Sequence, residues 1–130
     1  MKALDTNVLA RWIMRDHEEQ YQLAQQVIVV GAFVPITVIM ELEWILRSVA
    51  GYSRNQITGA LSAIMELETL DFPDRDALSR AIDDYRQGAD WADLIHLIQA
   101  SAAATFLTFD RKLSRRPHSV SPVVVELIHA

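Results

Sequence analysis

Five acidic residues of this chain lie either where an expected strand ends or in the first two turns of an expected helix. Carboxylate oxygens are the protein ligands that Mg²⁺ and Mn²⁺ prefer, and these ions complete their coordination with water and substrate phosphates. If the five side chains met at one place, they would form a metal site suited to phosphate chemistry. The five residues are Asp5, Glu41, Asp90, Asp93 and Asp110.

Each of these acids also has a local structural explanation. Asp5 and Asp90 precede helical patterns and would serve as N-caps, because a short side-chain oxygen accepts a hydrogen bond from a free backbone N–H. The helix dipole would stabilise Asp93 in a first turn, Asp110 would be a turn residue, and Glu41 would be a solvated helix flank. Taken one at a time these roles are the commoner ones, so only the convergence of the acids favours a metal site.

The elements that would position the acids alternate between short apolar runs and helical patterns. The expected strands are 2–4, 32–34, 69–72, 106–108 and 123–127, and the expected helices are 7–14, 17–30, 37–49, 54–67, 73–87 and 90–104. Such alternation predicts an α/β fold with a parallel sheet and helices on both faces. Ligands bind at the carboxyl ends of parallel strands, so we expect the five acids at one edge of the sheet.

Length and composition fit one compact domain over residues 1–130, with 51% hydrophobic and 22% charged residues. The sequence has no cysteine, which excludes disulfides and thiolate metal sites and suits a reducing cytoplasm. Only two apolar residues separate Lys2 from Asp5, unlike a signal peptide. The longest apolar stretch, 27–40, is interrupted by Gly31 and Pro35 and is shorter than the ~20 residues of a membrane span. We therefore expect a soluble, cytoplasmic protein.

The net charge of −5 argues against a general nucleic-acid coat, which would depend on many Lys and Arg side chains. One segment, "DRKLSRRPH" (110–118), nevertheless contains four of the twelve basic residues: Arg111, Lys112, Arg115 and Arg116. A basic patch on an acidic protein is commonly a solvated surface. Beside a site that uses phosphates, it would instead contact a nucleic-acid backbone.

Four motifs in order along the chain resemble those of PIN domains, in particular the VapC-type toxins of bacterial toxin–antitoxin pairs. They are "LDTNVL", "ELEWIL", "GADWADLIHLIQA" and "FLTFDRKL". A single motif of this kind is weak, whereas the ordered set is specific and covers nearly the whole chain. The resemblance implies a PIN-like three-layer α/β/α domain with a central parallel sheet flanked by helices.

The resemblance also implies roles for individual residues. The acidic pocket would consist of Asp5, Glu41, Asp93 and Asp110, of which Asp5, Asp93 and Asp110 would bind the metal. The supporting residues would be Thr6, Asn7, Asp90 and Thr108, with Asp90 expected as an N-cap and as a second candidate beside Asp93. Helical spacing does not separate Glu41 from Glu43, which flank the apolar stripe on opposite sides, and only the family alignment prefers Glu41.

The function implied is a metal-dependent endoribonuclease that hydrolyses RNA phosphodiester bonds with Mg²⁺ or Mn²⁺. Its implied partners are RNA, a small VapB-like antitoxin whose C-terminal segment crosses the acidic groove, and a second copy in a homodimer. The basic run beginning at Arg111 would hold the RNA backbone that the acids repel. Trp12, Trp44 and Trp91 could stack on bases, although tryptophans at helical spacing more often belong to the core. The histidines, which lie outside the motifs, are expected to be surface or packing residues.

Three other interpretations share some of these features. A phosphatase with an Asp nucleophile would need an acid at position 7, where this chain has Asn7. A receiver domain would need an Asp near the middle of the chain, and 49–67 contains none. A PIN-like scaffold that only binds RNA or protein would usually lack one of the acids, and all four are present here.

Overall fold

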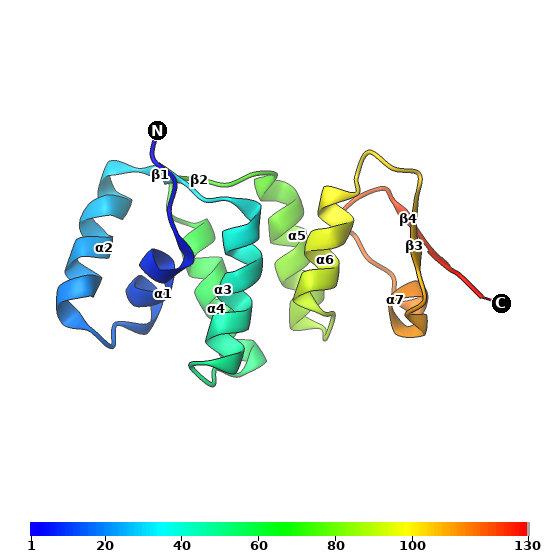
Figure 1. Ribbon diagram of the computed structural model, residues 1–130, viewed down its shortest axis with the longest axis horizontal. Coiled ribbons are helices and arrows are strands. Elements are labelled where there is room, and N and C mark those ends of the chain that lie inside the picture. Colours follow the sequence, from blue (N-terminus) through cyan, green and yellow to red (C-terminus); the bar gives the residue numbers. More distant parts are fainter. Residues whose placement is uncertain (130) are drawn as a thin grey trace. The chain divides into compact units, whose positions relative to one another are not determined.

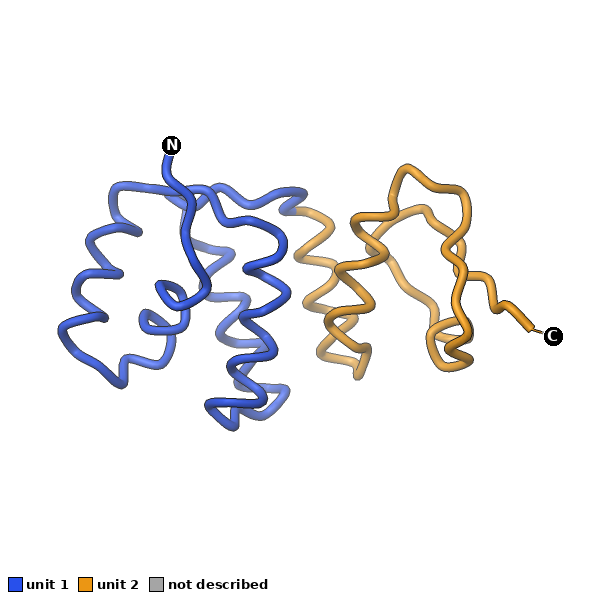
Figure 2. The backbone as a smooth tube through the Cα atoms, viewed as in Figure 1, with its two compact units in different colours: residues 1–75 blue, residues 76–130 orange. Residues whose placement is uncertain are grey.

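The computed structural model describes residues 1–129 of the chain, which divides into two compact units. Unit 1 comprises Met1–Arg75, and unit 2 begins at Asp76 (Figure 2). Each unit combines helices with a pair of parallel strands.

Unit 1 contains a small set of parallel backbone pairings around β1 (Ala32–Phe33). On one side β1 pairs with β2 (Leu70–Asp71), with Ala32 opposite Leu70. On the other side Ala3 forms a parallel bridge with Phe33. The N–H of Phe33 donates to the carbonyl of Lys2 at 2.8 Å, whereas those of its two neighbours donate toward β2. The expected strand 2–4 is therefore present as a single bridge.

Four helices complete unit 1: α1 (Thr6–Met14), α2 (Glu18–Val30), α3 (Ile36–Ser48) and α4 (Arg54–Met65). Helix α1 contacts α2 and α3, and α3 contacts α4 (Figure 1). The start of α4 is fixed by a capping box, in which Ser53 and Gln56 bond to each other's backbone N–H. Buried aliphatic side chains from all four helices form the core, among them Leu9, Ile28, Leu42, Leu46, Ile57 and Leu61.

Gly31 makes the turn from α2 into β1. Its φ of 101° lies in a region that other residues rarely adopt, and a Cβ there would lie 2.9 Å from the carbonyl oxygen of Thr69. The hydroxyl of Thr69 also donates to the carbonyl of Ile28 at 2.6 Å. The chain therefore leaves α2 tightly against the segment that leads into β2.

Unit 2 contains nearly all of α5 (Arg75–Arg86), then α6 (Trp91–Gln99), β3 (Thr105–Thr108), α7 (Arg111–Arg115) and β4 (Val124–Leu127). Strands β3 and β4 are parallel, and α7 lies in the connection between them and contacts both. The rings of Tyr85 and Trp91 meet edge to face at 5.6 Å where α5 gives way to α6. The carboxylate of Asp84 accepts from the backbone N–H of Ser119, which ties the segment before β4 to α5.

The expected α/β class with parallel strands is confirmed. A single central sheet between helix layers and a single domain over 1–130 stay predictions, because in the described chain hydrogen bonds pair strands only within each unit.

Two local predictions were wrong. The helix expected over 90–104 ends at Gln99, because the residues after it offer only small side chains to bury and helices depend on packing for their stability. The short helix α7 was not expected, although Asp110 before a helix-compatible run is a recognisable N-cap signal.

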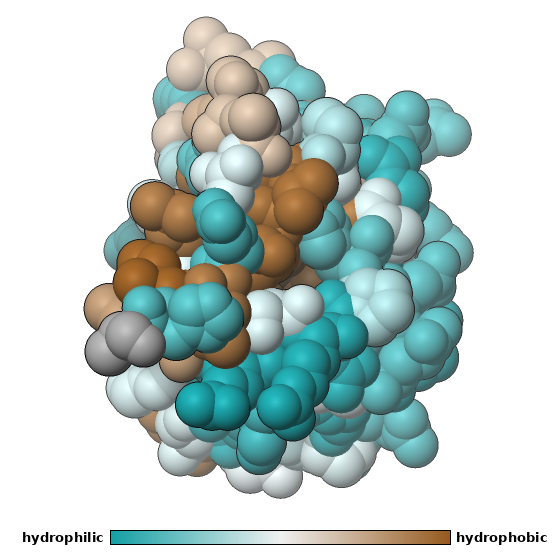
Figure 3. Space-filling model, turned by 90° about the vertical axis from the view of Figure 1, so that its right-hand side faces the viewer, coloured by the Kyte–Doolittle hydropathy of each residue, from teal (hydrophilic) through white to brown (hydrophobic). Residues whose placement is uncertain are grey.

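Alternate residues of β3 and β4 leave one face of their sheet exposed. Leu107 is 59% exposed and Val124 is 64% exposed, and Phe109, just after β3, is 77% exposed. Figure 3 views the molecule from the β3–β4 side and shows an apolar area next to a strongly hydrophilic one. Within residues 1–129, no helix combines the length and the apolar character that crossing a membrane requires.

Candidate active site

In unit 1, the start of α1 is linked to α3 by polar side chains. Asp5 is the N-cap of α1, and its Oδ1 accepts from the backbone N–H of Thr6 at 2.8 Å. Thr6 is 2% exposed, and its hydroxyl donates to Oε1 of Glu41 at 2.5 Å. The contact between α1 and α3 makes this bond available, so Asp5 stands next to the residue that holds Glu41.

The structure distinguishes the two glutamates of "ELEWIL". Glu43 is 5% exposed and forms an ion pair with Nε of Arg47 at 2.8 Å, one turn later on α3. Glu41 is exposed, and its carboxylate accepts from Thr6. Because Glu43 is buried and paired whereas Glu41 is exposed, Glu41 is the more accessible of the two acids.

In unit 2, two aspartates cap helices. Asp90 caps α6, accepting from the backbone N–H of Asp93 at 3.0 Å, as its position in the sequence predicts. Asp110 caps α7: its Oδ1 accepts from the backbone N–H of Lys112 at 2.9 Å. The backbone N–H of Asp110 in turn donates to the hydroxyl of Thr108 at 3.0 Å. These bonds fix both aspartates while leaving the other carboxylate oxygen of each free of the caps.

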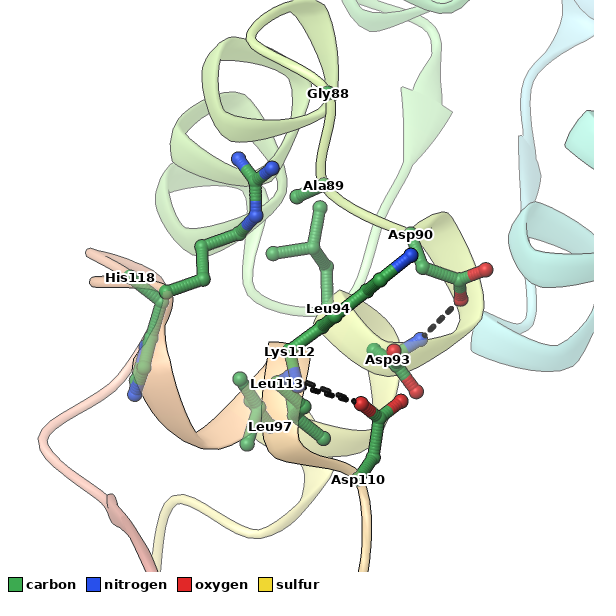
Figure 4. Close-up of a pocket in the computed structure, with 11 residues that line it drawn as sticks. Gly88, Ala89, Asp90, Asp93, Leu94, Leu97, Asp110, Lys112, Leu113 and His118 are labelled. Atoms are coloured by element: carbon green, nitrogen blue, oxygen red, sulfur yellow. Dashed lines mark hydrogen bonds between the residues drawn. The ribbon is translucent and has the colours of Figure 1, made fainter.

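The caps bring three carboxylates to one pocket of about 250 Å³ (Figure 4). Asp90 and Asp93 come from the start of α6, and Asp110 from the start of α7. Leucines form its apolar wall: Leu94, Leu97 and Leu113. Two cations, Lys112 and Arg116, also line it. The pocket therefore combines negative and positive side chains over an apolar wall.

The pKa of Asp93 is raised above its ordinary value. Partial burial is the largest cause, followed by the negative charges of Asp90 and Asp110, and the nearby His96 opposes them weakly. Asp90 and Asp110 are thus close enough to Asp93 to disfavour the ionisation of its carboxyl. A cation bound in the pocket would relieve that repulsion.

The donor set of the pocket fits a divalent ion. Among residues 1–129, no group of three or more His, Asp and Glu side chains is placed to hold a metal by itself. Mg²⁺ commonly takes only one or two protein carboxylates and fills its remaining positions with water and substrate phosphates. Asp93 and Asp110 are oxygen donors of that kind in one pocket, and Asp90 lies beside them.

The profile of the PIN domain matches residues 2–118, which is most of the sequence and extends over both units. The chain belongs to the PIN domain family. PIN domains are generally nucleases and typically use divalent metal ions, which supports a general ribonuclease function for this chain. Searches of curated proteins and of solved structures gave no significant match.

The remaining candidate residues are distributed unevenly. Asn7 is exposed at the start of α1 and lines a groove between α1 and α2. All four cations of the basic run are exposed, but only Lys112 and Arg116 line the pocket of the aspartates.

His118 and the three tryptophans lie in different surroundings. His118 also lines the pocket, with Nε2 2.9 Å from the carbonyl oxygen of Val123, and no motif or spacing points to it. Trp91 is buried, Trp12 donates to Gln25 at 2.7 Å, and Trp44 is 52% exposed.

Proposed function

We propose that this PIN domain is a metal-dependent endoribonuclease that hydrolyses phosphodiester bonds with Mg²⁺ or Mn²⁺. The observation that carries the proposal is the pocket of unit 2, which three aspartates and two cations line together and in which the pKa of Asp93 is raised. The aspartates suit a divalent ion, and the cations suit the phosphates of a nucleic acid. A pocket with both properties fits phosphodiester hydrolysis better than it fits a structural role.

The proposal assigns the catalytic acids to Asp5, Glu41, Asp93 and Asp110, with Asp5, Asp93 and Asp110 as metal ligands. When bound, the divalent ion would polarise the attacking water and offset charge on the phosphate oxygens. Glu41, held through Oε1 by Thr6, would orient the water with its other carboxylate oxygen. The N-cap bonds of Asp5 and Asp110 would fix the directions of these two carboxylates before substrate arrives.

The supporting residues act on those acids. Thr6 positions Glu41, and Thr108 accepts from the backbone of Asp110. Asp90 accepts from the backbone of Asp93 and raises the pKa of its carboxyl. Asn7, exposed beside Thr6, is assigned to the same supporting group.

We also propose the biological setting that the four motifs imply. The chain would act in the cytoplasm, as one domain over residues 1–130, and as the toxin of a type II toxin–antitoxin pair. Its partners would be RNA, a VapB-like antitoxin that blocks the acids, and a second copy of the chain. The exposed apolar side chains of β3 and β4 support a protein partner, since an exposed apolar patch commonly marks an interface.

Incubation of the purified chain with single-stranded and structured RNA tests the proposal. We expect cleavage with Mg²⁺ or Mn²⁺ and none in excess EDTA. Cleavage that continues unchanged in EDTA would contradict the metal mechanism. Binding of RNA without cleavage under any metal would indicate a scaffold instead, and release of phosphate from small phosphate esters alone would indicate another phosphohydrolase.

A further inference from the structure

The pocket of the aspartates is lined by side chains of both charges. Asp90, Asp93 and Asp110 line it together with Lys112 and Arg116. In the described part of the chain, neither Lys112 nor Arg116 belongs to an ion pair. In Figure 4, Lys112 extends across the pocket in the direction of Asp90, and Arg116 also lines this pocket. Both cations are therefore available to an anionic ligand.

The backbone of α7 explains why these two cations share a side. The backbone N–H of Arg116 donates to the carbonyl of Lys112 at 3.1 Å, which places the two residues one helical turn apart. Arg111 and Arg115 have the same spacing on the same short helix, yet neither lines the pocket of the aspartates. The basic run is thus divided into a pair that lines the pocket and a pair that does not.

Arg116 also approaches the two residues that follow α5. Its Nη1 donates to the carbonyl of Gln87 at 3.5 Å. Gly88 has a φ of 111°, and a Cβ there would lie 3.5 Å from Nη2 of Arg116. The guanidinium therefore lies near the backbone of Gln87 and Gly88, while the residue stays exposed to an incoming ligand.

We propose that Lys112 and Arg116 form a clamp for one phosphodiester group of the RNA substrate, and that Arg111 and Arg115 take no direct part. The inference rests on the proposed function and makes it more specific. A phosphate between the clamp and the aspartates would meet cations on one side and a metal-binding set on the other. Guanidinium and ammonium groups together are well suited to this task, because Arg donates in a fork and Lys acts as a compact charge.

Two double variants separate the clamp from a general electrostatic effect. Lys112→Ala with Arg116→Ala removes the pair that lines the pocket, and Arg111→Ala with Arg115→Ala removes the same charge from the same helix. The probe is a fluorescently labelled single-stranded RNA of about twelve nucleotides, comparable to common single-strand binding sites. Binding is measured by polarisation in EDTA at several salt concentrations, so that cleavage plays no part.

We expect the first double variant to bind about tenfold more weakly at 0.1 M salt, with a log–log salt slope flatter by about 0.7, which corresponds to one lost phosphate contact. The RNA affinity of the second double variant should stay within about threefold of that of the wild type, because its two lost charges act on the RNA only at a distance, where salt screens them. Equal weakening in both variants, or no binding by the wild type, would overturn the clamp. The same RNA incubated with Mg²⁺ tests the nuclease proposal separately, since the wild type could cleave whichever pair matters.

The melting temperature of each variant, measured in the same buffer, shows whether the variant is folded. The single variant Lys112→Gln keeps the length of the side chain and removes only its charge. We expect its salt slope to be flatter than that of the wild type by about 0.35, roughly half of the change in the first double variant. A slope equal to the wild type in a folded Lys112→Gln protein would exclude Lys112 from the clamp.

Discussion

The hydroxyl of Thr6 donates to Oε1 of Glu41 at a distance of 2.5 Å, and this hydrogen bond joins the first turn of α1 to the second turn of α3. Thr6 is buried and directly follows Asp5, so one short segment both caps a helix with an acid and holds a second acid from a distant part of the sequence. The bond explains how an exposed glutamate keeps a fixed direction. It also makes Thr6 a positioning residue that can be tested without altering any acid.

We expect Thr6→Val to reduce RNA cleavage by about tenfold or more, because a misdirected Glu41 would no longer orient water well. Loss of the hydrogen bond should lower the free energy of unfolding by about 1 kcal/mol. Thr6→Ser keeps the hydroxyl and is the control, with near wild-type cleavage. Single-turnover cleavage and urea denaturation measure the two effects. Equal cleavage by the Val and Ser variants would show that the bond serves stability alone.

If Asp5 and Asp93 bind a metal as proposed, neutralising either of them should remove activity without removing stability. We expect Asp5→Asn and Asp93→Asn to abolish cleavage, while Asp5→Asn keeps its helix cap, because Asn caps about as well as Asp. Mg²⁺ at about 100 times its dissociation constant should stabilise the wild type by roughly 2.7 kcal/mol, and the Asn variants should show little of this effect. Melting curves with Mg²⁺ and with EDTA provide the comparison. The same Mg²⁺ response in all three proteins would contradict a shared metal and, with it, the nuclease proposal.

The sequence predicted the elements best where local chemistry decides them. Ser53 begins α4 as expected, because the cap and its partner Gln56 are three residues apart in the chain. The end of α6 was missed because alanine-rich residues favour a helix locally, whereas packing ends it at Gln99. Helix α7 was missed because five residues are too few to show a helical period.

The kinds of residue in the candidate site could be predicted from the sequence better than their arrangement in space. Asp90, Asp93 and Asp110 line one pocket of unit 2, and Thr6 bonds to Glu41 in unit 1. The choice between Glu41 and Glu43 could have been improved, because Arg47 one turn after Glu43 is the usual spacing of an ion pair on a helix. The division of the basic run could not have been predicted, because it depends on which side of the unexpected α7 faces the pocket.

The three tryptophans should respond differently to substitution. Trp91 is 2% exposed, so Trp91→Ala should lower the free energy of unfolding by about 3–5 kcal/mol. Trp44, which lies one turn after Glu41 on α3, is 52% exposed, so Trp44→Ala should change the free energy of unfolding by less than about 0.5 kcal/mol.

If Trp44 stacks on a base of the substrate, Trp44→Ala should weaken RNA binding by 1–3 kcal/mol, about 5- to 150-fold, and Trp44→Phe should restore most of it. Fluorescence quenching by RNA in EDTA, lost in Trp44→Phe, identifies the ring involved. Unchanged affinity in a folded Trp44→Ala protein would exclude stacking at this position.

The raised pKa of Asp93 sets a pH dependence of stability in the absence of metal. Because folding raises this pKa, the folded state holds the proton more tightly than the unfolded chain does. Asp93 therefore contributes stability that is fully present below its unfolded pKa and is lost as the pH rises through the raised folded pKa. We expect Asp93→Asn, which cannot ionise, to escape that loss, so in EDTA its stability advantage over the wild type should grow across this window and then level off.

Asp90→Asn keeps a capping side chain but removes one of the charges that raise the pKa of Asp93, so its window should lie at lower pH than that of the wild type. Urea denaturation at closely spaced pH values gives the three curves. Parallel curves for the wild type and Asp93→Asn would show that this carboxyl titrates alike in the folded and unfolded chains, which would contradict a raised pKa of Asp93 in the pocket.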